Sequence, residues 1–572
     1  RQPTWDTRVR LVAQTNGGDL VLADTLSPLR NGFGGNSANV VKASSYWDWL
    51  LRFEPQLFWP EDEISDRLAS LPYNPLISII LPTYNTPPYF LRRCLQSVLD
   101  QKYANWQLCA ADDCSSDGGV LTYLRTVADR DARINISEGA SHGGISKASN
   151  RALENASGDF IVLLDHDDEL HAFALLELVR RLNHGQSASL IYSDEDKIDV
   201  YGRRSQPAFK PGFDMDVLLS FDYVGHLIAV RRSVVMEIGG FRPVCDGSQD
   251  WDLLVRVVET IGSAAVSHIQ KPLYHWRMHP ESTALNIDAK PYVRRAWTRV
   301  ISGHLERTGR QFTVENGMAD GLTRLRPHAG PKNRVAVFTR IEDGDFQRAA
   351  IEVNMDRRCT AVYQINSCIV REIFEEQTAN DTDCSLSSIT EMNEDVFVFI
   401  NRPLETINHF FFDELAGQSL RADCGIVTGI ATDIAGKIVH SGFILGASGE
   451  LVDPFAGLNY SEPTYMHQLN VVRSVEAISD HFFAVRREHL IAVGGLGSIS
   501  SVQMPRLVHA LMKHARGRGM NILVTPFALA TFEDPGRLSD PQPMHHDNSP
   551  DIQLNRNLLA FEDLREVSRG RI

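Results

Sequence analysis

Short apolar segments alternate with helical patterns between residues 76 and 164, and this alternation limits the possible folds more than any other feature. Four apolar segments have the length of buried strands: LISIILP (76–82), WQLCAADD (106–113), INISEG (134–139) and FIVLL (160–164). Residues 89–100, 120–130 and 146–156 carry apolar side chains at helical spacing. Strands and helices that alternate over short links predict an α/β fold, with an open, mostly parallel sheet covered by helices on both faces.

Polar clusters stand where these strands end. PTYN (82–85) follows the first strand, DDCSSDG (112–118) the second and LDHDDEL (164–170) the fourth. Ligands of open α/β sheets bind at the carboxyl ends of the strands. We therefore expect one pocket to collect all three clusters.

Three carboxylates in the last cluster, on Asp165, Asp167 and Asp168, directly follow the apolar run FIVLL. Such a group is self-repulsive unless a cation is present, and an Asp-x-Asp spacing lets two side chains point the same way. Magnesium and manganese take oxygen ligands of this kind and bridge to phosphate oxygens. The alternative is a solvated acidic turn that caps the next helix, because aspartate favours helix starts.

Length and charge narrow the class of protein. A chain of 572 residues is too long for one core and predicts several domains. A net charge of -15 argues against a nucleic-acid-binding protein, which needs a basic face. Eight cysteines without a CxxC pair favour reduced, cytosolic thiols over a disulfide frame or a zinc site. No apolar run approaches the length of a membrane span, and no signal peptide is visible after Arg1.

An internal repeat indicates duplication of one domain type. AVRRSVVMEIGGF (229–241) recurs as AVRREHLIAVGGL (484–496), and residues 158–170 have a weaker echo at 394–406. The second copy replaces Asp165, His166, Asp167 and Asp168 by Asn401, Arg402, Pro403 and Leu404. The predicted organisation is an N-terminal helical or irregular extension (1–75), a first domain (76–325), a degenerate second domain (326–545) and a tail (546–572). Within the extension, the aromatic segment 45–58 predicts a short helix packed on a neighbour.

Six motifs in a fixed order carry a resemblance to a known family. They are PTYN, DDCSSDG, HGGISKASNRAL (142–153), LDHDDEL, GSQDWDL (247–253) and LYHWRMHPEST (273–283). Together they closely resemble glycosyltransferase family 2, the inverting nucleotide-sugar enzymes with a GT-A, Rossmann-like fold. SDEDKID (193–199) and residues 209–227 are similar to the subset that builds bacterial surface polysaccharides such as O-antigens. The resemblance covers about residues 40–310, and it implies two GT-A-like domains in tandem, the second degenerate.

The resemblance implies a nucleotide-sugar site on the first strand ends. It assigns base and ribose contacts to Pro82, Tyr84 and Asp113, with Asp112 beside them. Lys147 and Asn150 follow the HGG turn, where a lysine can meet a diphosphate. Simple packing of Tyr84 and a solvated Lys147 remain the alternatives.

The resemblance also implies a divalent cation, Mn²⁺ or Mg²⁺. Asp165 takes the place of the first acid of the DxD motif, near the ribose and the metal, and Asp167 that of the metal ligand. His279 matches a late histidine that completes the metal shell, although the family's tyrosine is Trp276 here and His275 competes for the role.

Asp250 aligns with the catalytic acid of the family, in a QD pair where ED is usual. An inverting transfer needs one carboxylate that takes the proton of the acceptor hydroxyl. The position at a helix start also permits a plain capping role. Acceptor or sugar contacts are assigned to a further set: Asp168, Asp194, Glu195, His226 and His275.

These assignments predict a transferase that moves a sugar from a nucleotide-sugar donor to a growing glycan or lipid-linked acceptor. It would act in the cytoplasm, with at most peripheral contact to the inner membrane face and with other assembly enzymes as partners. In SVQMPRL (501–507), Met504 or Pro505 stands where the base belongs, so the second copy is expected to be inactive, unless it uses metal-independent chemistry. A non-catalytic glycan-binding scaffold is the main alternative function. A nucleotidyltransferase is disfavoured, because PTYNTPPYF lacks a Gly-rich basic loop.

Overall fold

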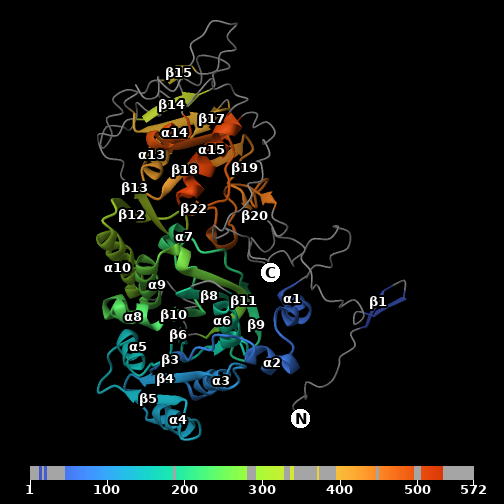
Figure 1. Cartoon of the computed structure of the whole chain (residues 1–572), viewed down its shortest axis with the longest axis vertical. Coiled ribbons are helices and arrows are strands. Elements are labelled where there is room, and N and C mark those ends of the chain that lie inside the picture. Colours follow the sequence, from blue (N-terminus) through green and yellow to red (C-terminus); the bar gives the residue numbers. More distant parts are fainter. Residues whose placement is uncertain are drawn as a thin grey trace.

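The computed structural model describes two lobes stacked along the long axis of the molecule, each built on one large sheet (Figure 1). The described residues are 45–184, 188–279, 291–327, 335–339, 370–372, 394–402, 404–445, 450–494 and 504–532, together with the backbone of 12–15 and 18–21. The predicted tail 546–572 lies outside them.

The predicted alternation of strands and helices at the start of the first lobe is confirmed. Its elements are β3 (Ile77–Thr83), α3 (Pro88–Leu99), β4 (Trp106–Asp112), α4 (Gly119–Ala128), β5 (Ile134–Glu138), α5 (Ile145–Glu154) and β6 (Phe160–Leu163). Successive side chains of a strand point to opposite faces, so Ile79 and Ile80 enter two different hydrophobic cores. A strand buried on both faces needs apolar residues at every position, which explains the uninterrupted apolar runs.

The rest of the first lobe adds antiparallel strands to a sheet that stays rich in parallel pairs. It adds β7 (Glu169–Leu170), α6 (Ala174–Leu182), β8 (Leu190–Ile198), β9 (Arg204–Ala208), α7 (Met215–Ser220), β10 (Ile228–Arg231), α8 (Arg232–Glu237), α9 (Gln249–Ile261), β11 (Val266–Arg277) and α10 (Pro291–Thr308). The strand order is β5-β4-β3-β6-β10-β8-β11-β7, with β9 on β8. Strands β5, β4, β3 and β6 are parallel, whereas β10 is antiparallel to both of its neighbours. The antiparallel insertion could not be predicted from apolar runs, because strand direction depends on the connections.

The N-terminal extension is tied to the first lobe by α1 (Tyr46–Arg52), as the aromatic segment predicted. Trp49 is fully buried and its ring lies 5.1 Å from that of Phe209. Ser45 caps the helix by accepting a hydrogen bond from the amide of Asp48. Nearby lie η2 (Glu54–Leu57), η3 (Glu61–Glu63) and α2 (Ile64–Ala69), while β1 (Val12–Thr15) and β2 (Gly18–Val21) form an antiparallel ribbon that the sequence did not suggest.

The second lobe follows a hairpin of β12 (Phe312–Asn316) and β13 (Thr323–Pro327). Its main sheet contains β14 (Val335–Thr339), β15 (Val370–Glu372), β16 (Val396–Ile400), β17 (Leu404–Ile407), β18 (Cys424–Asp433), β19 (Ile438–His440), β22 (Arg473–Ser474), β23 (Phe482–Arg486) and β24 (Asn521–Phe532). Helices α13 (Phe411–Ser419), α14 (Arg487–Ala492) and α15 (Met504–Gly517) pack on it, and β20 (Ile444–Leu445) pairs with β21 (Leu451–Val452).

The main sheets of the two lobes share a strand order. The second reads β15-β14-β16-β23-β18-β24-β17, with β19 on β18. Each pairing from β15 to β17 has the same parallel or antiparallel sense as the corresponding pairing from β4 to β7. The repeated segments 229–241 and 484–496 begin in β10 and β23, and each continues into the helix that follows. Among the described helices, none has the length and apolarity needed to cross a bilayer.

Candidate active site

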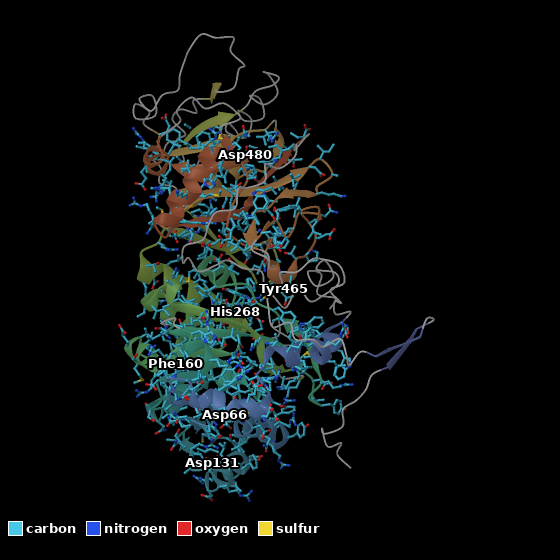
Figure 2. All side chains as sticks on the ribbon, turned by 45° about the vertical axis from the view of Figure 1, so that its right-hand side comes forward. Asp66, Asp131, Phe160, His268, Tyr465 and Asp480 are labelled. Atoms are coloured by element: carbon cyan, nitrogen blue, oxygen red, sulfur yellow. The ribbon has the colours of Figure 1, made fainter. Side chains whose placement is uncertain are left out.

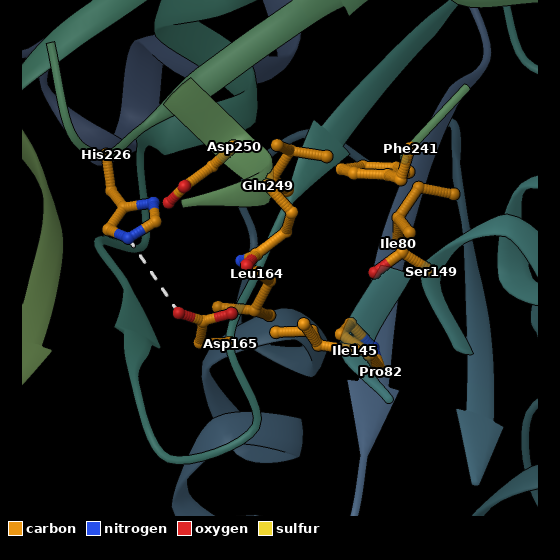
Figure 3. Close-up of a pocket in the computed structure, with 11 residues that line it drawn as sticks. Ile80, Pro82, Ile145, Ser149, Leu164, Asp165, His226, Phe241, Gln249 and Asp250 are labelled. Carbon is orange, nitrogen blue, oxygen red and sulfur yellow. Dashed lines mark ion pairs between the residues drawn. The ribbon is translucent and has the colours of Figure 1, made fainter. Parts of the chain in front are cut away.

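A pocket opens at the carboxyl ends of β3 and β6 in the first lobe (Figure 3). Its lining comes from the sheet, from the starts of α5 and α9 and from the segments before β10 and α9: Ile80, Pro82, Ile145, Ser149, Leu163, Leu164, Asp165, His226, Phe241, Gln249 and Asp250. Figure 3 shows Asp165, His226 and Asp250 gathered at one side of the pocket, with Ile80 and Phe241 at the other. The pocket thus pairs an ionisable wall with an apolar one.

Asp165, Asp168 and His226 form a cluster able to hold a metal ion. One ligand atom of each lies within 4.8 Å of those of the others. His226 Nε2 lies 3.8 Å from Asp165 Oδ2, so the imidazole faces that carboxylate. The sequence predicted acceptor or sugar contacts for Asp168 and His226, because nothing in it shows that His226 meets the acids after β6.

Asp168 is fully buried beneath the pocket. Its carboxylate accepts hydrogen bonds from Tyr274 Oη at 2.6 Å and from the amide of Arg277 at 2.7 Å. Burial raises the pKa of Asp168 well above its usual range, and the charges of Asp167 and Asp165 raise it further. The pKa of Asp165 is also raised, by burial first, with the Asp167 charge adding to the effect. A divalent cation would relieve this repulsion.

Asp167 and His279, both predicted as metal ligands, lie side by side. Asp167 Oδ2 is 2.7 Å from His279 Nε2, and both side chains are largely buried. Burial acts to raise the pKa of Asp167, but the hydrogen bond to His279 and the charge on His166 outweigh it and the net shift is downward. The charge on Asp167 also acts on Asp165, so this pair lies near the cluster of Asp165, Asp168 and His226. Carboxylate oxygens are the ligands that Mn²⁺ and Mg²⁺ take.

Asp250 occupies the first turn of α9. Its Oδ1 accepts a hydrogen bond from the amide of Trp251, while Asp252 on the same turn is buried between Arg242 and Arg256. Of these two acids, only Asp250 lines the pocket. Asp250 is therefore available to a ligand in the pocket, whereas Asp252 forms ion pairs within the fold.

The same part of the chain matches a known family. Residues 78–239 match the model described as "Glycosyl transferase family 2". The chain carries a glycosyltransferase family 2 domain. The pocket and its acids lie in this domain and in the helix that follows it.

Curated relatives extend the similarity beyond the domain. The chain is 31% identical over 491 residues to "Uncharacterized protein y4gI" of Sinorhizobium fredii, which covers 81% of this chain and 54% of that protein. It is 29% identical over 476 residues to "O-antigen biosynthesis protein RfbC" of Myxococcus xanthus, covering 79% of this chain and 36% of that protein. Over 93 residues it is 42% identical to "UDP-Glc:alpha-D-GlcNAc-diphosphoundecaprenol beta-1,3-glucosyltransferase WfgD" of Escherichia coli, covering 16% of this chain and 35% of that protein. The chain thus spans about half or less of the length of these relatives.

Two solved structures are similar to part of the chain. "S. aureus TarS 1-349 in complex with UDP-GlcNAc" has a TM-score of 0.32 and 17% identity, over 40% of this chain and 66% of that one. "Mannosyltransferase PcManGT from Pyrobaculum calidifontis in complex with GDP-Man and Mn2+" has a TM-score of 0.31 and 17% identity, over 44% of this chain and 71% of that one.

Some of the residues predicted to bind nucleotide face the pocket or solvent, whereas others are bonded within the fold. Pro82 lines the pocket, and Tyr84 is exposed on the following loop, with its ring 4.1 Å from that of His142. Asp113 is buried and accepts hydrogen bonds from the amides of Gly143 and Gly144, with His142 Nδ1 at 2.8 Å. Asp113 therefore shapes the turn before α5, and a contact with a base stays a prediction.

Asp112 and Asn150 make hydrogen bonds within the fold. The Asp112 carboxylate accepts hydrogen bonds from Thr83 and Ser115. Both amide atoms of Asn150 bond the backbone of Phe241, at 2.8 Å each. Their geometry favours positioning the pocket walls over touching a ligand, whereas Lys147 is exposed and remains available for a diphosphate.

Three residues predicted to contact the acceptor have protein partners instead. Asp194 is fully buried, with Lys210 N at 2.9 Å and His268 Nε2 at 2.8 Å. Glu195 pairs with the Lys210 ammonium at 2.9 Å, and His275 lies 2.6 Å from Asp196. Because these groups are satisfied inside the fold, the geometry does not favour acceptor contacts for them.

Asp222 is an acid that sequence reasoning missed. It precedes Gly225, whose amide donates to Asp222 Oδ1 at 3.1 Å. Burial raises the pKa of Asp222 to about 7, with the Asp250 charge as the next contribution. The only sequence signal was its place in a polar break, SFDYVG, before an apolar strand.

Asp222→Asn is expected to stabilise the protein, and by more at pH 8 than at pH 5. A carboxyl whose folded pKa is raised contributes stability below its unfolded pKa, near 4, and loses it as pH rises through about 7. From pH 5 to the folded pKa of about 7 is two units at about 1.4 kcal/mol each, so the gain at pH 8 should exceed the gain at pH 5 by roughly 3 kcal/mol, or about 5–10 °C in Tm. Thermal unfolding at both pH values measures this, with the exposed Asp66→Asn as control. An equal Tm difference at pH 5 and pH 8 would contradict the assignment.

Proposed function

We propose that this chain is a metal-dependent inverting glycosyltransferase with a GT-A-type catalytic domain over residues 76–325. One observation carries the proposal: Asp165, His226 and Asp250 line one strand-end pocket, and Asp168 lies within ligand reach of Asp165 and His226. A scaffold protein would have no need for a self-repulsive acidic pocket of this kind.

Each residue has a chemical task in this proposal. Asp250 accepts the proton of the acceptor hydroxyl as the new bond forms. Asp165, Asp167, Asp168, His226 and His279 are the residues that would hold the cation, which when bound stabilises the charge of a departing diphosphate. Pro82, Tyr84 and Lys147 are left to contact the nucleotide. The apolar wall with Ile80 and Phe241 excludes water from the reacting groups.

The relatives support a place in bacterial polysaccharide assembly. One is named for O-antigen biosynthesis, and another for transfer to a diphosphoundecaprenol-linked sugar. We propose a growing glycan or lipid-linked acceptor, met at the inner face of the cytoplasmic membrane.

We further propose that the second lobe, residues 326–545, is a degenerate copy of the catalytic domain. The shared strand order and pairing senses support this. The β16–β23 register aligns Asn401 with Asp165 and His481 with His226, so the histidine is kept while the acid is lost. Met504, fully buried, and Pro505 begin α15, where α9 begins with Gln249 and Asp250. Such a copy has no acid at either position.

A donor panel tests the catalytic proposal. The full chain is incubated with MnCl₂ and UDP-, GDP- or dTDP-sugars, and released nucleoside diphosphate is measured. We expect release from one donor class, at least tenfold above background, and its loss on addition of EDTA. Absence of release with every donor and glycan acceptor, together with tight glycan binding, would support the scaffold function instead.

A further inference from the structure

Residues 207–226, here called the bridging segment, connect the interface between the lobes to the pocket. The segment runs from the end of β9 through α7 to His226. Its last residue faces Asp165, and the second lobe touches its beginning, its middle and the end of α7. These contacts indicate that the second lobe can influence the position of His226.

Lys210 fixes the pocket end of the segment. Its ammonium is almost fully buried and donates to Ser193 O at 2.8 Å, to Val224 O at 2.5 Å and to His226 O. The same group pairs with Glu195, whose Oε2 accepts a hydrogen bond from the His226 amide at 2.7 Å. The backbone at His226 is therefore held from both sides by one ammonium–carboxylate pair. Any displacement of Lys210 would displace His226 as well.

Tyr465 of the second lobe holds the backbone directly before Lys210. Its hydroxyl accepts a hydrogen bond from Phe209 N at 2.6 Å and donates to Pro207 O at 3.1 Å. In Figure 2, Tyr465 is labelled at the level where the two lobes meet. One hydroxyl thus satisfies two backbone groups of the first lobe at the start of the bridging segment.

The turn that carries Tyr465 contacts the first lobe. It is η7 (Tyr465–His467), in which Met466 and His467 have φ of 50° and 54°. Non-glycine residues rarely adopt this conformation unless their surroundings impose it. Met466 packs against the first-lobe core, and the His467 ring lies 5.8 Å from Phe221, beside Asp222.

Two polar contacts hold the middle of the segment. The amide of Ser474 donates to Asp214 Oδ2 at 2.6 Å, where Asp214 caps α7. Arg421 Nη1 lies 2.8 Å from Asp216 Oδ1 in the first turn of that helix. The second lobe therefore contacts the bridging segment before, at and after α7.

We propose that Tyr465 is a positioning residue of the first-lobe site, acting through Lys210 on His226. The second lobe then contributes to transfer without acids of its own, because it fixes the backbone that presents His226 to Asp165. The kinetic part of this inference rests on the proposed function, whereas the structural part does not.

Tyr465→Phe removes the hydroxyl and keeps the ring packing. Tyr460→Phe is the matched control, since its hydroxyl donates to Pro526 O at 3.0 Å inside the second lobe. Hydrogen–deuterium exchange of the full chain should show amides of residues 222–228 exchanging about tenfold faster in Tyr465→Phe and unchanged in Tyr460→Phe, with similar Tm for both. Unchanged exchange at 222–228, or the same increase in both variants, would overturn the proposal.

Kinetics give a second, separate readout. Tyr465→Phe should lower kcat about tenfold with little change in the donor KM, and should have no further effect when combined with His226→Ala, because residues that act as a unit are not additive. An additive loss in the double variant would overturn action through His226. If the wild-type chain releases no nucleotide from any donor, the proposed function fails, and the exchange experiment alone decides the positioning role.

Discussion

Asp250→Asn is expected to lower the rate of sugar transfer about 10³-fold, the range found when a general base is removed. The amide keeps the size of the side chain and an oxygen for the Trp251 amide, so α9 should begin as before. The variant cannot accept the proton of the acceptor hydroxyl. Donor affinity should stay near the wild-type value, because the residues proposed to contact the nucleotide lie on β3, on the loop that follows it and on α5.

The measurement pairs turnover with donor binding. Nucleoside diphosphate release gives kcat, and calorimetry with the donor that is turned over gives Kd. Glu237→Gln, an exposed acid on α8, serves as a control that should leave both unchanged. A variant with more than a tenth of wild-type kcat would show that Asp250 only caps its helix.

Asp165→Asn is expected to abolish stabilisation by divalent cations. A ligand at a hundred times its Kd stabilises the folded state by about 2.7 kcal/mol, which for a domain of this size is about 5 °C in Tm. Wild-type protein should therefore show this shift with saturating MnCl₂, and the variant almost none. Burial is the main cause of the raised pKa of Asp168, and the Asp165 charge adds to it. Loss of that carboxylate removes part of the repulsion, so the variant without metal should be at least as stable as the wild type.

The thermal shift is measured with and without EDTA. Asp129→Asn, at the exposed end of α4, should respond to Mn²⁺ as the wild type does. A full Mn²⁺ shift in Asp165→Asn would place the cation elsewhere and remove the chemical basis of the proposed function.

The sequence determined the features that depend on neighbours in the chain. Apolar runs such as FIVLL made β6 recognisable, because a strand buried on both faces needs no partner to reveal its pattern. The start of helix α9 was also predictable, because its apolar spacing and its acids are neighbours in the sequence. The place of Asp165 at a strand end and of Asp250 at a helix start followed from these elements.

Only the tertiary structure decided what the polar side chains face. Asp168 and His226 meet because β6 and β10 are antiparallel neighbours, a pairing set by the intervening chain rather than by either motif. Asp194 and His275 are the same residue types as the site residues. Inside the fold, however, Asp194 pairs with His268 and His275 pairs with Asp196. Whether a carboxylate or an imidazole binds a ligand or pairs with another side chain depends on the groups that long-range packing brings next to it. The local motif does not contain that information.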